Sequence, residues 1–107
     1  LFENMILMEI LKSRYNVGLQ SNIYFWRHNK GHEIDCIIEK SDVLLPVEIK
    51  SGRTFNFNFF SELNYWNNIS GNNKKNTFVV FGGNKDFLGA EGNAFAWKNI
   101  GKILKLI

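Results

Sequence analysis

The spacing of apolar and polar residues predicts two helices. Residues 1–15 are rich in Leu, Met and Glu, and their apolar side chains recur at the intervals of an amphipathic helix. Helical spacing returns over residues 58–69. The apolar side of this second helix is expected to carry Phe59, Leu63, Trp66 and Ile69.

Between the two helices, the pattern changes to aromatic and β-branched segments separated by turn residues. It predicts an antiparallel meander of three strands, at residues 22–28, 32–39 and 43–51. A continuous apolar run at residues 77–81 is typical of a buried strand. Farther on the pattern weakens, and we expect a short edge strand at residues 94–97 and a frayed end at residues 103–107. The fold class is therefore α/β, in the order helix, three strands, helix, strand.

Alternation of side chains along a strand places charged residues together. If Ser41 and Asp42 form the turn between the second and third strands, Asp35 lies opposite Glu48 and Glu33 lies opposite Lys50. Facing residues of an antiparallel pair lie about 4.5–5.5 Å apart at Cβ, and like charges at that distance repel. A divalent cation would relieve the repulsion, and Mg²⁺ takes oxygen ligands.

The same alternation gives each of these strands an apolar face. On the second strand it consists of Ile34, Cys36 and Ile38, and on the third strand of Leu45, Val47 and Ile49.

Glu3 adds a carboxylate from the first helix. Around that helix it falls away from the solvent stripe, beside Leu7 and Ile10. A carboxylate among apolar residues costs free energy unless it is paired or bound to metal. We therefore expect Glu3 to point at a site.

These residues resemble the PD-(D/E)xK nuclease superfamily: Glu3 in a first helix, then Asp35, then Glu48 and Lys50 after a short hairpin. The resemblance implies a restriction-endonuclease-like core with a mixed central sheet flanked by helices. A closer likeness is to a prokaryotic family of unknown function in which such a domain follows an AAA-type ATPase domain. It rests on four phrases of the sequence, LFEN, YFWR, EID and VEIKSG.

The resemblance implies a Mg²⁺-dependent (or Mn²⁺-dependent) phosphodiesterase that acts on nucleic acid. Of the two nucleic acids, DNA is the expected substrate. Asp35, Glu48 and the carbonyl of Ile49 would hold the metal, and Glu3 would join them directly or through water. Lys50 would orient or deprotonate the attacking water, with Glu33 as its partner. An alternative is the same fold without catalysis, serving nucleic-acid binding, protein interaction or regulation of the ATPase.

Several other residues could take part in catalysis or binding, but each also has a purely structural interpretation. His32 is expected to be a satisfied strand histidine rather than a metal ligand, and Cys36 a small core residue rather than a nucleophile. Five basic residues could contact phosphates or simply be solvated: Arg27, Lys30, Arg53, Lys74 and Lys75. Several aromatic residues could stack on bases, pack in the core or form a docking surface for the ATPase domain: Phe55, Phe57, Phe59, Phe60, Tyr65 and Trp66.

Composition narrows the class of protein. The 107 residues allow one domain, and 45% apolar with 21% charged residues excludes a disordered or collagen-like chain. No apolar run is long enough to span a membrane, and the single cysteine fits the reducing cytoplasm. The net charge of +3 permits a polyanionic partner without requiring one. A chain that starts at Leu1 within a helical pattern is expected to be a piece of a longer protein.

Overall fold

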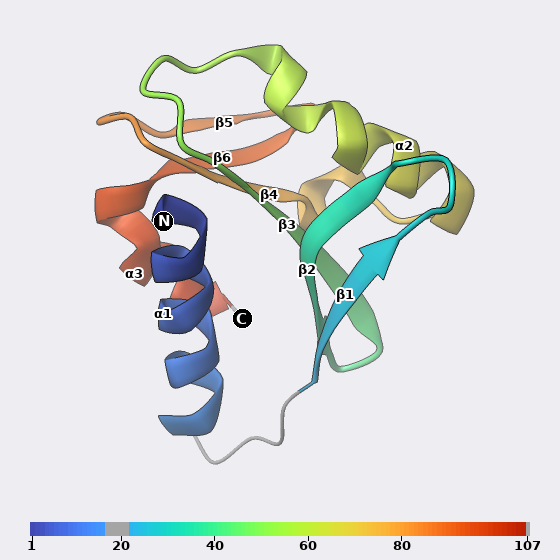
Figure 1. Ribbon diagram of the computed structural model, residues 1–107, viewed down its shortest axis with the longest axis horizontal. Coiled ribbons are helices and arrows are strands. Elements are labelled where there is room, and N and C mark those ends of the chain that lie inside the picture. The colour runs from blue at the N-terminus through green and yellow to red at the C-terminus, as the bar shows by residue number, and fades with distance from the viewer. Residues whose placement is uncertain (17–21, 107) are drawn as a thin grey trace.

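The computed structural model describes residues 1–16 and 22–106, which form one mixed sheet with helices on both sides (Figure 1). The helices are α1 (Phe2–Asn16), α2 (Ser61–Ser70) and α3 (Ile100–Leu106). The strands are β1 (Ile23–Arg27), β2 (Glu33–Lys40), β3 (Val43–Lys50), β4 (Phe78–Phe81), β5 (Phe87–Gly89) and β6 (Gly92–Ala96). The predicted order of helix, three strands, helix and strand is confirmed, and β5, β6 and α3 follow it.

The six strands lie in the order β1-β2-β3-β4-β6-β5. β1, β2 and β3 form the predicted antiparallel meander. β4 then pairs parallel to β3, and β6 pairs parallel to β4, so the centre of the sheet is parallel. A parallel neighbour requires a crossover connection, and α2 supplies the one between β3 and β4.

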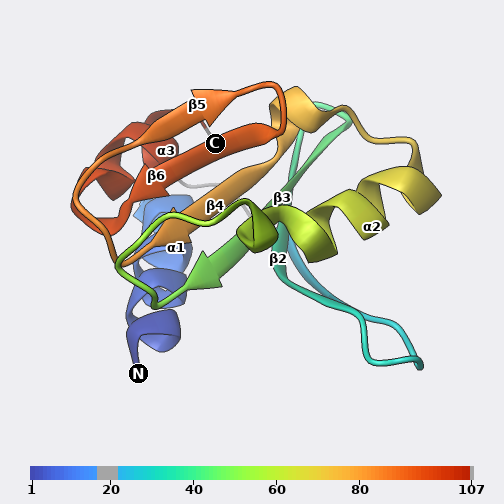
Figure 2. The same ribbon diagram turned by 90° about the horizontal axis from the view of Figure 1, so that it is seen from above.

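Each face of the sheet carries its own apolar core. On one face, α1 and α3 contribute Ile6, Ile10 and Ile103 to a cluster with Val47 and Val80. On the other face, α2 packs Leu63 and Trp66 against a second cluster. Figures 1 and 2 show α2 on one side of the sheet and α1 with α3 on the other. Parallel strands covered on both faces read as continuous apolar runs, and β4 is buried throughout.

The β2–β3 hairpin has the predicted register. Its pairs run from Lys40↔Val43 to Cys36↔Val47. The turn residues Ser41 and Asp42 have φ of 51° and 67°. Positive φ at both central residues is the geometry of a two-residue turn whose twist matches that of the flanking strands.

The C-terminal part departs from the prediction. The expected edge strand at residues 94–97 is β6, which lies inside the sheet between β4 and β5, and the edge strand β5 was not predicted. The expected frayed end is helix α3, whose Ile103 is fully buried; residue 107 lies outside the described residues. On α2, Ile69 is 58% exposed rather than part of the apolar side; it lies in the last turn of the helix, whose buried residues are Leu63, Trp66 and Asn67.

Candidate functional site

A β-bulge on β2 decides where Asp35 points. Tyr24 of β1 pairs with Ile37 of β2, and the next paired residue of β1, Trp26, lies opposite Ile34. Two steps along β1 thus correspond to three steps along β2, so β2 has one extra residue in this interval. A bulge of this kind re-aims the side chains that follow it. Asp35 is thereby turned toward α1.

The bulge corrects one expectation about the faces of β2. Strict alternation put Ile34 on one face with Cys36 and Ile38, and Asp35 on the other. In the structure Ile34 belongs to the cluster beneath α2, whereas Cys36 and Ile38 belong to the cluster beneath α1. The local sequence does not reveal this shift, because the inserted residue is itself compatible with a strand.

Where the backbone pairing of β2 and β3 ends, the side chains of Asp35 and Glu48 each accept a hydrogen bond from the backbone of the other strand. The N–H of Asp35 donates to Glu48 Oε1 at 2.8 Å, and the N–H of Ile49 donates to Asp35 Oδ2 at 2.7 Å. These reciprocal bonds replace backbone hydrogen bonds with charge-assisted ones. The negative charge of Asp35 also raises the pKa of Glu48, so the two carboxylates interact although the bulge has changed the face of Asp35.

Glu48 is buried, with 4% of its surface exposed. Burial raises the pKa of its carboxyl to about 7, and the negative charge of Asp35 adds to the rise, against the opposing effects of the Asp35 N–H and the Lys50 amine. The Lys50 amine lies 3.4 Å from Glu48 Oε2. A buried carboxylate beside another carboxylate is repelled by it, and a bound cation would relieve this repulsion.

Glu3 lies in the first turn of α1 and lines the same cleft as Asp35. The negative charge of Asp35 raises the pKa of the Glu3 carboxyl, and partial desolvation adds to the rise. The structure thus brings Glu3, Asp35, Glu48 and Lys50 into one chain of interacting charges.

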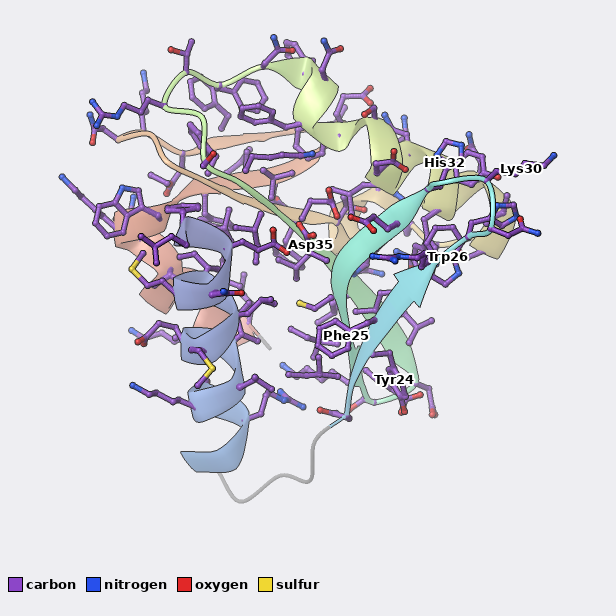
Figure 3. The ribbon with its side chains drawn as sticks, viewed as in Figure 1. Tyr24, Phe25, Trp26, Lys30, His32 and Asp35 are labelled. Carbon is purple, nitrogen blue, oxygen red and sulfur yellow. The ribbon has the colours of Figure 1, made fainter. Side chains whose placement is uncertain are left out.

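The cleft between α1 and the β1–β2 strands has a volume of about 310 Å³. Figure 3 shows Asp35 on its β2 side. Arg27 Nη2 lies 3.1 Å from Glu33 Oε2. Glu33 is therefore paired with Arg27, and the expectation that it would pair with Lys50 is wrong, since the β2–β3 pairing that would align them stops at Cys36↔Val47. Eight residues line the cleft: Glu3, Leu7, Phe25, Trp26, Arg27, Glu33, Ile34 and Asp35.

The donor set fits a small hard cation. Its side-chain atoms are carboxylate oxygens, and Mg²⁺ is commonly bound by one or two carboxylates while it keeps several waters. Among residues 1–16 and 22–106, however, no group of three or more His, Cys, Asp or Glu side chains is arranged so that it could hold a metal ion. The geometry fits a site of the open, two-carboxylate kind built on Asp35 and Glu48, with Glu3 beside it.

Two other candidates have structural roles. His32 Nδ1 lies 2.9 Å from Glu62 Oε2, and its ring stacks on Tyr65 at 3.8 Å, so this histidine ties the hairpin to α2. Cys36 is fully buried, and burial raises the pKa of its thiol to about 12. The expectations of a satisfied histidine and a core cysteine are both confirmed.

The basic residues do not form one group. Lys74 and Lys75 precede β4, near the Ser41–Asp42 turn and away from the end of β3 that carries Lys50. Lys74 Nζ lies 3.3 Å from Glu91 Oε2. This ion pair favours the interpretation of Lys74 and Lys75 as solvated surface charges rather than phosphate contacts. Arg27 lines the cleft, Lys30 lies at the tip of the β1–β2 hairpin (Figure 3), and Arg53 is exposed just beyond β3.

Most of the aromatic candidates pack in the core, as one of the alternatives held. Phe60 and Trp66 are buried, and Phe55 and Phe59 pack against the cluster beneath α2. Phe57 is 71% exposed and lines a second hollow, of about 360 Å³, on the β5 side of the sheet.

One protein family matches nearly the whole chain, including every residue of the candidate site. The model of DUF4143, a domain of unknown function, matches residues 1–100. The chain belongs to the DUF4143 family. The matched range includes Glu3 and Asp35, which line the acidic cleft. It also includes Glu48 and Lys50, which do not line it; Glu48 interacts with Asp35 and with Lys50, so the whole arrangement is part of the DUF4143 domain. No curated protein and no solved structure matches the chain. Over the described part of this DUF4143 domain, no helix has the length and apolar character needed to cross a membrane.

Sequence reasoning missed one feature of the DUF4143 cleft. Phe25 lines it and is 69% exposed, although it lies in the middle of an apolar strand segment. The segment NIYFWRH predicts a strand but not which aromatic ring stays uncovered. That depends on α1 and on the bulge opposite Phe25, neither of which is local in sequence.

Proposed function

We propose that this domain is a metal-dependent phosphodiesterase that acts on nucleic acid, with a site of the PD-(D/E)xK kind. The observation that carries the proposal is the reciprocal bonding of Asp35 and Glu48, with the Lys50 amine 3.4 Å from Glu48. Two acids on adjacent strands and a lysine two residues after the second acid are the arrangement that the resemblance implies.

Asp35, Glu48 and the carbonyl of Ile49 are the proposed ligands of Mg²⁺ or Mn²⁺. When bound, the metal would polarise a phosphodiester oxygen and lower the pKa of a coordinated water. Lys50 would orient that water and balance negative charge that develops on the phosphate. Glu3 would hold metal-bound water from the α1 side of the cleft.

The protonation behaviour of Glu48 supports a cation site. A carboxyl with a pKa of about 7 keeps its proton through mildly acidic conditions, because burial and Asp35 both oppose its charge. A dication would reverse that balance, since it attracts both carboxylates. Metal binding would therefore release a proton at neutral pH and strengthen as the pH rises.

The proposal extends to the architecture. The order α1, β1–β3, α2, β4 with a mixed sheet supports a restriction-endonuclease-like core. The family resemblance further implies an AAA-type ATPase domain in the same polypeptide, which would deliver nucleic acid to the cleft. On this view the domain works in the cytoplasm on DNA.

The test combines metal binding with cleavage. We expect MgCl₂ or MnCl₂ to raise the melting temperature of the wild-type protein, because a ligand that binds only the native state stabilises it. Asp35→Asn should lose this shift. Glu9→Gln, which removes an exposed carboxylate elsewhere on α1, should keep it. Supercoiled and branched DNA should be nicked by wild type and not by Lys50→Ala.

Three results separate the candidate functions. Equal thermal shifts in wild type and Asp35→Asn would remove the metal site and the proposal with it. A metal shift without nicking, together with salt-dependent DNA binding, would favour the catalytically inactive nucleic-acid-binding module. Absence of DNA binding as well would favour a protein-interaction module.

A further inference from the structure

Phe25 is an exposed aromatic ring in a polar cleft. Ile23, two residues before Phe25 on β1, pairs with Ile38 and packs against the cluster beneath α1, so by alternation Phe25 also faces α1. Figure 3 shows its ring pointing from β1 toward α1, on the side of Asp35, whereas Tyr24 and Trp26 point the other way. Yet 69% of Phe25 remains exposed, so the helix does not cover it.

The cleft that Phe25 lines is small and strongly charged. Its volume of about 310 Å³ is at the lower end of the range for pockets that hold one small molecule. Glu3, Glu33 and Asp35 line it together with Arg27, whose side chain is 81% exposed. A nonpolar protein surface seated there would have to bury these charges, which is costly. The lining instead suits a ligand with a flat ring for Phe25 and an anionic group for Arg27, with the proposed metal ion offsetting the negative charge of the three carboxylates.

We propose that this cleft accepts one unpaired nucleotide, with its base stacked on Phe25 and its phosphate directed toward Arg27 and the Asp35–Glu48 end. This inference rests on the proposed function and specifies its substrate class: single-stranded nucleic acid, or a strand end separated from its complement. Aromatic stacking tolerates any base, because every base has a π-face. A base inside a duplex is stacked on its neighbours and must leave that stack before it can stack on the Phe25 ring.

The experiment measures binding by fluorescence anisotropy, with all proteins in a Lys50→Ala background to limit cleavage and with MgCl₂ present. Three labelled probes of equal length are compared: a single strand of mixed sequence, the same strand made abasic, and the duplex. We expect the single strand to bind at least about fivefold more tightly than the abasic strand, the lower end of the range for stacking on one aromatic ring.

Two substitutions of Phe25 and one matched control identify the ring. Phe25→Ala should abolish the difference between the base-bearing and abasic strands, and Phe25→Leu, which keeps an apolar side chain, should also lose most of it. Tyr24→Ala should retain the difference, because Tyr24 is exposed on the same strand but pairs with Ile37 on the other face. Because Phe25 is exposed, we expect these variants to fold like their parent, and circular dichroism would check it.

The inference is overturned if the abasic strand binds as tightly as the base-bearing one, if Phe25→Ala binds like its parent, if the duplex binds more tightly, or if no probe binds. These outcomes are distinct from failure of the proposed function, which the Asp35→Asn thermal shift reports without any nucleic acid. A metal shift that depends on Asp35 together with base-independent binding would retain the nuclease proposal and remove only the role of Phe25.

Discussion

At the scale of single residues, the site depends on two carboxylates that act as backbone partners. Asp35 accepts from the N–H of Ile49, and Glu48 accepts from the N–H of Asp35. Each bond fixes a carboxylate at the point where β2 and β3 part. The bonds also leave a buried acid, Glu48, in an environment that disfavours its charge.

The protonation of Glu48 should make the stability of the metal-free protein depend on pH. Its pKa is raised from 4.5 in the unfolded chain to about 7 in the folded one. Between these values the unfolded chain releases a proton that the folded chain retains, so the free energy of unfolding falls as pH rises through this window. Glu48→Gln should flatten the fall without removing it, because the pKa of Glu3 is also raised.

Urea unfolding in EDTA, at about pH 5 near the lower end of the window and at about pH 8 above its upper end, would measure this change. Glu9→Gln, which removes an exposed carboxylate, serves as the control and should retain the wild-type slope. A Glu48→Gln variant with the same loss of stability as wild type would show that the Glu48 carboxyl is not responsible.

At the scale of elements, α3 contacts both the core of the sheet and the segment that leads into the β5–β6 hairpin. Ile103 is fully buried in the cluster beneath α1 and α3. Asp86 joins the same parts by accepting from Ala96 N–H at 2.9 Å and from Lys102 at 3.0 Å. A short helix of seven residues has little stability of its own, so these contacts hold it in place.

We expect Ile103→Ala to lower the free energy of unfolding by about 2–5 kcal/mol, the usual cost of removing a large aliphatic side chain from a packed core. Ile69→Ala is the matched control, since Ile69 is the same residue type but 58% exposed on α2. Its effect should lie within about 0.5 kcal/mol of zero. Chemical denaturation of both variants would measure the difference, and similar losses would mean that α3 is not docked as described.

At the scale of the whole molecule, the two ends of the sheet differ in chemistry. The end of β3 near Lys50 carries the acidic cleft with Arg27 on its lining. Lys74 and Lys75 lie toward the Ser41–Asp42 turn. The net charge of +3 therefore does not describe a single basic face, and only part of it can act on a nucleic acid held at the cleft.

The proposed orientation of the nucleic acid predicts which cations matter. Arg27→Ala should weaken binding and lower the slope of log affinity against log salt by about 1, because one phosphate contact is lost. Lys75→Ala should leave the slope unchanged, since it removes the same charge from the other end. Anisotropy titrations at several salt concentrations would compare them. An equal effect of both substitutions would indicate diffuse attraction rather than binding at the cleft.

Much of the fold follows from short-range patterns. Alternation in β2 and β3, together with Ser41 and Asp42 at the turn, was enough to predict the hairpin register. The helical spacing of residues 1–15 predicted that Glu3 points at a site, and the structure places it in the cleft beside Asp35, although its side chain is exposed rather than packed among apolar residues. In contrast, α3 was missed because seven residues are too few for a distinct helical period, and its burial depends on a cluster formed by distant strands.

The sequence by itself determined the α/β class, the hairpin that holds Asp35 and Glu48, and the identity of the acids and lysine, because turn chemistry and side-chain alternation act over a few residues. Tertiary structure alone decided the direction of Asp35, the pairing of Glu33 with Arg27, and the exposure of Phe25. These three depend on the bulge in β2 and on the packing of α1 against the sheet. Their physical cause is contact between segments far apart in the chain, which local spacing does not encode.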